Sequence, residues 1–254
     1  MSSAQLAGKV AVVTGGTGGI GRAISVELAS SGCHVAFTFN NDEEGAATLT
    51  QEIQSHGVKA LSIRSDLAIM ESSQQVISKA KEHFGRIDML VINAAVWMSQ
   101  SLLTLKIEDF DRIQAINVRS SFLLCQAAAK EMVKQGDGGS IIVITSRGWS
   151  RPRPGTSAYA ISKAGQHALA HIAAIELAEF GIRVNEVVPG PIETEMNRVL
   201  RESAQDFSAL TDGILLKRFG LPKDIAKMVL FLVSPDADFI TGSSFRVDGG
   251  ISVP

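Results

Sequence analysis

Short apolar runs alternate with longer amphipathic segments along the whole chain. Several runs, such as Val10–Val13 and Ile141–Ile144, are apolar at consecutive positions, which is typical of strands buried on both faces of a sheet. The pattern predicts seven strands, at Lys9–Thr14, His34–Phe39, Lys59–Arg64, Ile87–Asn93, Ser140–Ser146, Arg183–Val188 and Ser244–Val247. It predicts helices between them, at residues 19–31, 42–56, 70–84, 107–135, 157–180 and 222–234.

This strand–helix alternation predicts the α/β class, in the form of a doubly wound, seven-stranded parallel sheet of the Rossmann type with helices on both faces. No Ser/Pro-rich linker, low-complexity tract or internal repeat divides the sequence, so residues 1–254 are expected to form a single domain that binds a dinucleotide and carries the catalytic group. Residues 195–220 interrupt the alternation. Because they follow the carboxyl end of a strand, they are expected to form a substrate lid.

Composition narrows the class of protein without choosing a function. The chain has 254 residues, 45% hydrophobic and 20% charged, with a formal net charge of -2. It therefore lacks the basic surplus expected of a protein that binds nucleic acid or an anionic membrane. No apolar stretch approaches the roughly 18 residues of a membrane span, and the first residues lack the apolar core of a signal peptide. Cys33 and Cys125 are expected to be buried thiols in a reducing, cytoplasmic environment.

A glycine-rich segment, Thr14–Gly21, joins the first predicted strand to the first predicted helix. Glycines let the backbone turn tightly and approach a pyrophosphate, and the helix N-terminus offers free N–H groups and a partial positive charge. Gly16, Gly18 and Gly21 satisfy the G-x-G-x-x-G spacing, which is weak evidence alone because a turn without a ligand can also satisfy it. The position in the strand–turn–helix unit favours a dinucleotide site.

The end of the second strand bears on the choice of nucleotide. A carboxylate there commonly binds the adenosine ribose, but this chain has Phe39. No carboxylate therefore repels a 2′-phosphate, which favours NADP(H). Because no Arg or Lys stands at Gly18, Asn40 or Asn41 to attract that phosphate, NAD(H) remains the alternative. The acidic run Asp42–Glu44 suits the first turn of the next helix.

Tyr159 and Lys163 are spaced i, i+4 and so share one face of a helix. Ser146 ends a predicted strand, at the sheet edge where α/β proteins bind ligands. A phenol has a pKa near 10, and a neighbouring ammonium favours its phenolate form, so we expect Lys163 to make Tyr159 an acid/base near neutral pH. The Ser146 hydroxyl would bind the substrate oxygen. A Tyr-x-x-x-Lys pair alone is more often a core residue beside a solvated one, but Tyr159 is the one tyrosine in the chain.

Together with Asn93–Ala95, Asn117–Val118 and Pro189–Thr194, these motifs closely resemble the short-chain dehydrogenase/reductase family, over about residues 8–250. The resemblance implies an NAD(P)(H)-dependent oxidoreductase that interconverts a secondary alcohol and a ketone, on a 3-oxoacyl, sugar or other carbonyl substrate. It implies that Asn117 joins Ser146, Tyr159 and Lys163 as the catalytic group by anchoring a water that relays protons to Lys163.

The resemblance also implies the contacts of the nucleotide. Asp66 would contact the adenine, Asn93 and Ala94 the adenosine half, Lys163 the nicotinamide ribose, and Thr194 the nicotinamide. The full set of residues expected to bind the cofactor is Gly15, Thr17, Gly19, Ile20, Gly21, Phe39, Asn40, Asp66, Leu67, Asn93, Ala94, Tyr159, Lys163, Pro189, Ile192 and Thr194. The chain departs from the family pattern at Ala95, where Gly is usual, and at Thr145, where Ser is common.

Two further groups of residues carry weaker signals. His167 and His171 are spaced i, i+4 as in metal sites, but no Glu or Cys completes the set in the sequence, so no metal is expected. Three arginines precede Tyr159, and one of them could bind a carboxylate, phosphate or acyl-carrier substrate, although a solvated, proline-stiffened loop is the more common explanation of such a run. These are Arg147, Arg151 and Arg153. Substrate selection is expected at Trp97, Met98, Trp149 and Met196–Leu200.

The helix from Ala158 to Ala178 is apolar nearly all round, so a second subunit is expected to cover part of it. The family pairs this helix and the preceding one between subunits, which implies a homotetramer or a homodimer. A protein that binds the nucleotide as a sensor without turnover is the alternative function, and it should lack part of the catalytic group. An epimerase or dehydratase would need a longer chain, with a C-terminal substrate domain.

Overall fold

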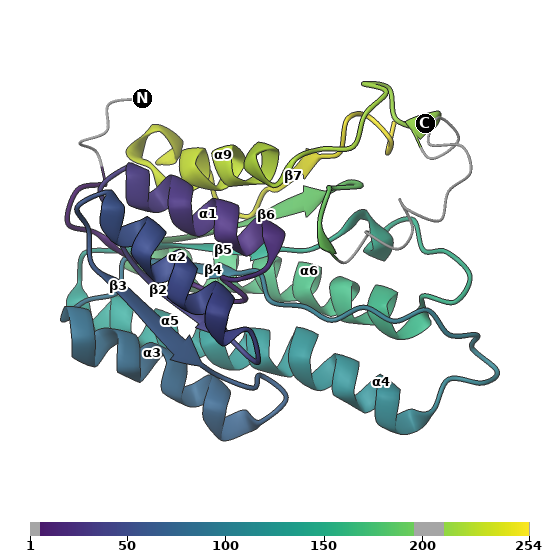
Figure 1. Cartoon of the computed structure of the whole chain (residues 1–254), viewed down its shortest axis with the longest axis horizontal. Coiled ribbons are helices and arrows are strands. Elements are labelled where there is room, and N and C mark those ends of the chain that lie inside the picture. The colour runs from purple at the N-terminus through teal and green to yellow at the C-terminus, as the bar shows by residue number, and fades with distance from the viewer. Residues whose placement is uncertain (1–5, 196–210, 254) are drawn as a thin grey trace.

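Seven strands form one parallel sheet, in the order β3-β2-β1-β4-β5-β6-β7, in the computed structural model, which describes residues 6–195 and 211–253 (Figure 1). The strands are β1 Val10–Val13, β2 His34–Phe39, β3 Ala60–Arg64, β4 Met89–Ile92, β5 Gly139–Ile144, β6 Ile182–Pro189 and β7 Ser244–Val247. The main helices are α1 Gly19–Ser30, α2 Glu43–Ser55, α3 Met70–Phe84, α4 Ile107–Gln114, α5 Ser120–Gln135, α6 Ser157–Leu177 and α9 Pro222–Val233. The predicted α/β class and parallel sheet are confirmed.

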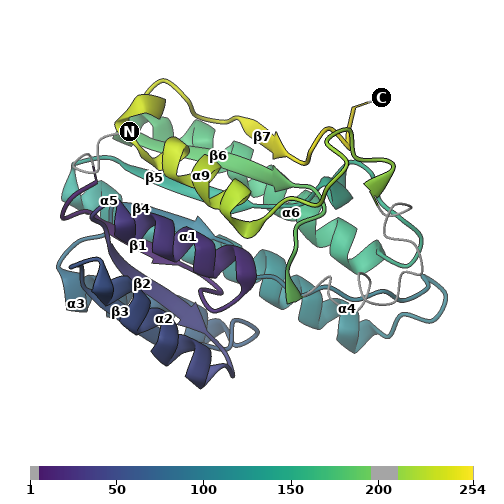
Figure 2. The same cartoon turned by 45° about the horizontal axis from the view of Figure 1, so that its top comes forward.

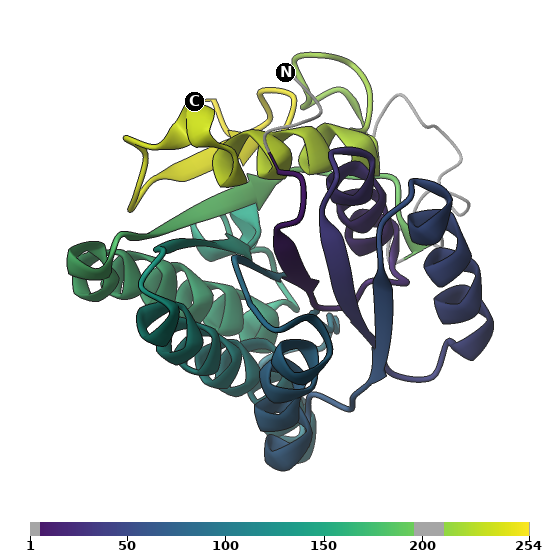
Figure 3. The ribbon, with the colours of Figure 1, turned by 90° about the vertical axis from the view of Figure 1, so that its left-hand side faces the viewer.

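Helices cover both faces of the sheet because successive side chains of each strand point to opposite sides (Figure 3). On β1, Ala11 and Val13 pack into the core shared with α1, α2 and α9. Val10 and Val12 pack into the second core, shared with α3, α5 and α6. The consecutive apolar residues of the strands are explained by this double burial.

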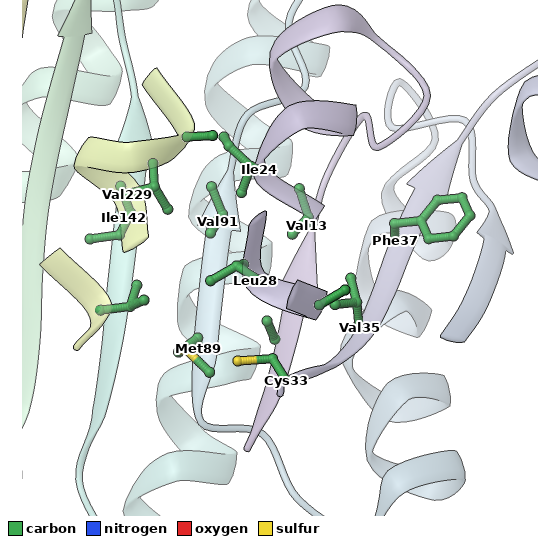
Figure 4. Close-up of a cluster of buried hydrophobic side chains, with 14 of the residues drawn as sticks. Val13, Ile24, Leu28, Cys33, Val35, Phe37, Met89, Val91, Ile142 and Val229 are labelled. Carbon is green, nitrogen blue, oxygen red and sulfur yellow. The ribbon is translucent and has the colours of Figure 1, made fainter. Parts of the chain in front are cut away.

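Figure 4 shows the first of these cores, where Ile24 and Leu28 of α1 and Val229 of α9 lie against strand side chains. Ile24, Leu28 and Val229 are fully or almost fully buried. Each side chain of this kind contributes roughly 1.5–3 kcal/mol when it is removed from water. This packing fixes α1, and with it the glycine-rich loop that precedes the helix.

Two predicted elements differ from the structure in ways that affect the site. The helix expected over 107–135 is present, but a π-helical turn, Ala115–Arg119, lies within it between α4 and α5. The strand expected to end at Ser146 ends at Ile144, and a 3-10 turn, Arg147–Trp149, follows. Ser146 is the N-cap of that turn rather than a strand residue.

The order of the strands reverses between β1 and β4, which are neighbours in the sheet although two strands separate them in sequence. Ligands of doubly wound sheets bind in the crevice beyond the carboxyl ends of the strands at such a point. The glycine-rich loop follows β1 here, and Asn93 and Ala94 follow β4. Figure 2 shows α1 over β1 and its neighbours, and α9 beside α1 over β5 and β6.

The predicted lid lies mostly outside the described residues, since 196–210 are not among them. Its described end is anchored beside β6 by a bridge between Ile192 and Gly220. The Glu193 N–H donates to the Gly220 carbonyl at 2.9 Å. Within the described residues, no helix has both the length and the apolar character needed to cross a bilayer.

Candidate active site

The glycine-rich loop adopts a conformation that side chains would prevent. Gly15 has φ +66°, and a Cβ at this position would lie 3.1 Å from the Ala94 Cα. A Cβ on Gly21 would lie 2.1 Å from the Gly15 carbonyl oxygen, which is far inside van der Waals contact. Glycine at these two positions therefore keeps the backbone tightly folded and open to a ligand.

The N-terminus of α1 is suited to an anion. Its N-cap is Gly18, which has no side chain to cap the helix, and no acidic residue lies in the first turn. The first N–H groups of a helix lack intrahelical partners and carry a partial positive charge. Thr194, from the segment after β6, reaches this same point, since a Cβ on Gly19 would lie 3.2 Å from the Thr194 Cγ2. The fold thus brings two predicted nucleotide residues together from distant parts of the sequence.

Thr14 ties the ends of β1 and β4 to each other. Its buried hydroxyl accepts hydrogen bonds from the backbone N–H groups of Asn93, at 2.9 Å, and Ala94, at 3.0 Å. The Asn93 side-chain amide donates to the Thr14 carbonyl at 2.9 Å. Asn93 and Ala94 therefore lie directly beside the loop, as the predicted adenosine contacts require.

The end of β2 carries the residues that are predicted to face the adenosine side of a dinucleotide. Phe39 is half-buried against the core and Asn40 is exposed. Asp42 caps α2 by accepting from the Gly45 N–H at 2.9 Å, with Glu43 and Glu44 in the first helical turn. The prediction that these acids belong to the helix is confirmed.

A cation that the sequence did not point to lies next to this position. Arg64 pairs with Phe39 in the register between β2 and β3, and its guanidinium lies 3.1 Å from the Glu43 carboxylate. Only the strand register reveals this neighbour, because 24 residues lie between the two positions in the sequence.

The other predicted nucleotide residues lie along the same edge of the sheet. Asp66 follows β3 and accepts from the Ala68 N–H at 2.9 Å. Thr17 lies in the glycine-rich loop, and Ile20 lies in the first turn of α1. Leu67 follows β3. Pro189 ends β6, and Ile192 lies in the segment that bridges to Gly220.

Tyr159, Lys163 and Ser146 lie together at the carboxyl edge of β5. The Lys163 Nζ lies 5.7 Å from the centre of the Tyr159 ring. The Ser146 hydroxyl is close enough to the Tyr159 phenol to lower its pKa, and it accepts from the Gly148 N–H at 3.1 Å. The 3-10 turn after β5 thus aims Ser146 at the phenol.

The charges of this group differ from the expectation. Burial raises the pKa of Tyr159, and the hydrogen bond from Ser146 opposes that effect only partly. Burial also lowers the pKa of Lys163 to about 7, against the charge of Glu186, which raises it. The expectation that Lys163 makes the phenol acidic is therefore not met by the protein alone, because burial outweighs the ammonium and leaves that ammonium only partly charged near pH 7.

A chain of buried side chains connects Lys163 to Asn117. The Lys163 ammonium donates to the Gln166 Oε1 at 2.7 Å and to the Ile144 carbonyl at 3.0 Å. The Gln166 amide donates to the Ser121 hydroxyl at 2.8 Å, and that hydroxyl donates to the Asn117 carbonyl at 2.6 Å. Sequence reasoning missed Gln166 and Ser121. The available signal in the sequence was a glutamine three residues after Lys163, in a helix rich in Ala and Leu.

Asn117 lies in the π-helical turn and is fully buried. Its side-chain amide bonds both the N–H and the carbonyl of Val96, each at 2.9 Å, and donates to the Ser162 hydroxyl at 2.9 Å. Such turns are frequent at functional sites because they displace one helical residue from the regular hydrogen-bond pattern. Here the side chain holds the segment after β4, while the backbone carbonyl faces the chain of side chains that leads to Lys163.

The prediction that no acidic residue completes the histidine pair is wrong. Glu186 of β6 lies 2.8 Å from the His167 Nδ1 and 3.8 Å from the His171 Nε2. The sequence could not reveal this, because pairing between β5 and β6, and the packing of α6 on β6, bring Glu186 to the histidines.

The residues expected to select substrate fall into two groups. Trp97 and Met98 follow β4, and the Trp97 side chain is 47% exposed. Trp149 stacks on His167 with ring centroids 3.9 Å apart, so one face of its indole is already covered. Met196–Leu200 lie outside the described residues.

Arg147 is half-buried beside Asp248, and Arg151 and Arg153 are exposed. Burial, and then the positive charge of Arg153, lower the pKa of Arg147, while Asp248 opposes them. The three predicted cations are therefore close enough to influence one another.

The fold and this geometry define a class of protein, the dinucleotide-binding oxidoreductases of the doubly wound α/β type. Residues 15–252 match the family described as enoyl-(acyl carrier protein) reductase. The chain is 35% identical to an L-rhamnose 1-dehydrogenase (NAD(P)(+)) of a Sphingomonas species, over 98% of each chain.

Solved structures give the same result. A short-chain dehydrogenase/reductase from Serratia marcescens superposes with a TM-score of 0.92 and 40% identity, covering 98% of this chain and 100% of that one. A blue fluorescent protein from a metagenomic library, in complex with NADPH, superposes with a TM-score of 0.92 and 38% identity over the same shares. The chain belongs to the short-chain dehydrogenase/reductase family. It is an NAD(P)(H)-dependent oxidoreductase that interconverts an alcohol and a ketone.

Proposed function

We propose that Tyr159 is the general acid/base of this reaction, with Ser146, Lys163 and Asn117 as its partners. The observation that carries the proposal is the meeting of three side chains at the carboxyl edge of β5, where the Lys163 Nζ lies 5.7 Å from the centre of the Tyr159 ring and Ser146 lies beside the phenol. The phenol gives a proton to a ketone oxygen in reduction and takes it from an alcohol in oxidation. Ser146 holds that oxygen and stabilises the negative charge on it.

The loop, the α1 N-terminus and the segment around Thr194 fit a dinucleotide, because glycine leaves room for a pyrophosphate and no acid opposes it. When bound, the nicotinamide supplies or accepts the hydride. Lys163 would hold the adjoining ribose, and Asp66, Asn93 and Ala94 the adenosine half. NADP(H) is preferred over NAD(H), since Phe39 offers no repelling carboxylate and Arg64 lies beside it.

Lys163 has a second role, as the link between the phenol and the protein interior. Its ammonium lies at the start of the chain through Gln166 and Ser121 to the Asn117 carbonyl. These bonds orient the ammonium beside the phenol ring. A bound oxidised nicotinamide would add a positive charge to the same pocket, and that charge would favour the phenolate form of Tyr159.

The substrate is a small carbonyl or alcohol compound of the 3-oxoacyl, sugar or related kind, selected beside Trp97 and Met98. Arg147, Arg151 and Arg153 favour an anionic group on it. Replacing both Arg151 and Arg153 with Ala should raise KM about tenfold for anionic substrates and by less than about twofold for neutral ones. Equal effects on the two classes would remove the arginines from substrate binding.

The experiment for the proposed function is a screen of the purified protein with NADPH and with NADH against ketones, 3-oxoacyl thioesters and sugars. Turnover by the parent chain and a loss of about a thousandfold or more in Tyr159→Phe are expected. Binding of NADPH without turnover across the whole panel would favour the sensor. Equal turnover by Tyr159→Phe would remove the phenol from the reaction while leaving the nucleotide site intact.

We propose that the enzyme is a homotetramer or a homodimer. An apolar groove between α5 and α6 supports this, and on α6 the exposed Ile172 and Ile175 lie at or near it. Ile172→Glu should shift the mass measured by light scattering toward that of the monomer. A parental mass would exclude this face from the interface.

We also propose a cytoplasmic location. Cys33 and Cys125 are unpaired and buried, and burial raises the pKa of each thiol to about 12. The predicted buried thiols are thereby confirmed, and they are compatible with a reducing compartment.

A further inference from the structure

His167, His171 and Glu186 form a cluster that the proposed reaction does not use. The ligand atoms of the three side chains all lie within 4.8 Å of one another. The histidines come from successive turns of α6 and the carboxylate from β6, so the cluster joins a helix to the sheet. The Glu186 side chain is fully buried, and the groups that contact its two oxygens are hydroxyls and imidazoles.

The Glu186 carboxylate is already held in one orientation. One oxygen, Oε1, accepts a hydrogen bond from the Thr145 hydroxyl. The other, Oε2, accepts from the Ser244 hydroxyl at 2.5 Å and faces both imidazoles. Metal-binding carboxylates and histidines are commonly oriented by outer partners of this kind. A cation at Oε2 would add to the stabilisation of this buried carboxylate, whose charge also acts on the Lys163 ammonium.

The spacing fits an ion of the zinc class. Zinc binds nitrogen and oxygen at about 2.0–2.2 Å, so two ligands of a tetrahedral site lie about 3.4 Å apart. The distances from the Glu186 Oε2 to the two imidazole nitrogens, 2.8 and 3.8 Å, bracket this value. Two imidazoles and one carboxylate favour Zn²⁺, Co²⁺ or Ni²⁺, whereas Mg²⁺ and Ca²⁺ prefer oxygen ligands.

We propose that His167, His171 and Glu186 bind one divalent transition-metal ion, with water in the remaining position. The ion lies beside the catalytic group without belonging to it. His167 follows Lys163 by one helical turn, Thr145 precedes Ser146, and the Trp149 ring covers His167. The ion fixes α6 to β6 and thereby stiffens the turn that carries Ser146. This inference does not depend on the proposed function, because its tests measure binding.

Trp149 makes the site visible in solution. The chain has two tryptophans, so Trp97→Phe leaves the one that stacks on His167 at 3.9 Å. Titration of the chelator-treated Trp97→Phe protein with Co²⁺ should quench its fluorescence by more than about half and saturate at one equivalent. Zn²⁺ alone should raise Tm by about 5 °C or more at saturation.

Matched variants separate this site from weak binding at the surface. In the same background, His171→Ala and Glu186→Gln should weaken Co²⁺ binding at least about tenfold, while His83→Ala, an exposed histidine on α3, should leave it unchanged. Glu186→Gln keeps the shape of the side chain, and a Tm measured without metal checks that each variant is folded. Absence of saturable quenching, or equal binding by His171→Ala and His83→Ala, would overturn the proposal.

Discussion

The two halves of the site obey different physical rules. The nucleotide half is built from backbone: Gly15 and Gly21 are fixed by close approaches of main-chain atoms, and the α1 N-terminus supplies the charge. The catalytic half is built from buried side chains, where Lys163, Gln166 and Ser121 depend on one another for hydrogen bonds. A backbone site fails when an atom is added to it, whereas a side-chain network fails when an atom is removed.

Ser146→Ala should separate the two halves most sharply. It removes the hydroxyl that lies beside the Tyr159 phenol, so kcat should fall by about 10²–10³-fold while the Kd for NADPH changes by less than about twofold. Steady-state kinetics and equilibrium binding measure the two quantities. Ser150→Ala is the control, since Ser150 is exposed and bonds only the Arg147 carbonyl in the same loop. A parallel loss of NADPH affinity would show that the halves are not separable.

Adding a methyl group to the glycine-rich loop should instead weaken the binding of NADPH. In Gly21→Ala the new Cβ meets the Gly15 carbonyl oxygen at 2.1 Å, so the loop must move and the Kd for NADPH should rise about 100-fold. In Gly18→Ala the nearest atom would lie at 3.5 Å, an ordinary contact, and the Kd should rise by less than about fivefold. Calorimetric titration measures both. Similar values for the two variants would mean that the close approach does not govern binding.

Gln166→Leu tests the network with a smaller effect. The substitution takes one acceptor from the Lys163 ammonium and leaves the Ser121 hydroxyl without its donor. Losing a buried partner costs roughly 1–3 kcal/mol, so kcat should fall about tenfold and the pKa of Lys163 should drop further below its ordinary value. The pH profile of kcat reports the shift. Gln51→Leu, at an exposed position on α2, should change neither, and an unaltered profile in Gln166→Leu would argue against the link.

The same division explains what the sequence could predict. Strands and helices follow from local periodicity, and the loop, Tyr159 and Lys163 follow from short spacings, so all of these were recognised. The break at Ala115–Arg119 was not predicted, because the apolar pattern runs through it without interruption. Glu186 and Arg64 were missed for a further reason. Their neighbours lie on other elements, and only the registers between strands and the packing of α6 bring them together.

One chemical expectation drawn from the sequence, on the pKa of Tyr159, differs from the structure. A lysine one turn from a tyrosine was expected to make it acidic, but proximity in sequence carries no information about burial. In the folded chain, burial acts on both groups in the unfavourable direction, raising one pKa and lowering the other. We therefore propose that a bound oxidised nucleotide would supply the positive charge that favours the phenolate form of Tyr159.

That assignment can be measured directly, because Tyr159 is the one tyrosine in the chain and its phenolate absorbs in the near ultraviolet. A pH titration of this absorbance, in the protein alone and with saturating NADP⁺, compares the two states of the same group. We expect a pKa above the ordinary value of a phenol for the protein alone, and a clearly lower pKa when the nucleotide is bound. The same pKa in both titrations would contradict the account, because the phenol would then have no source of acidity at neutral pH.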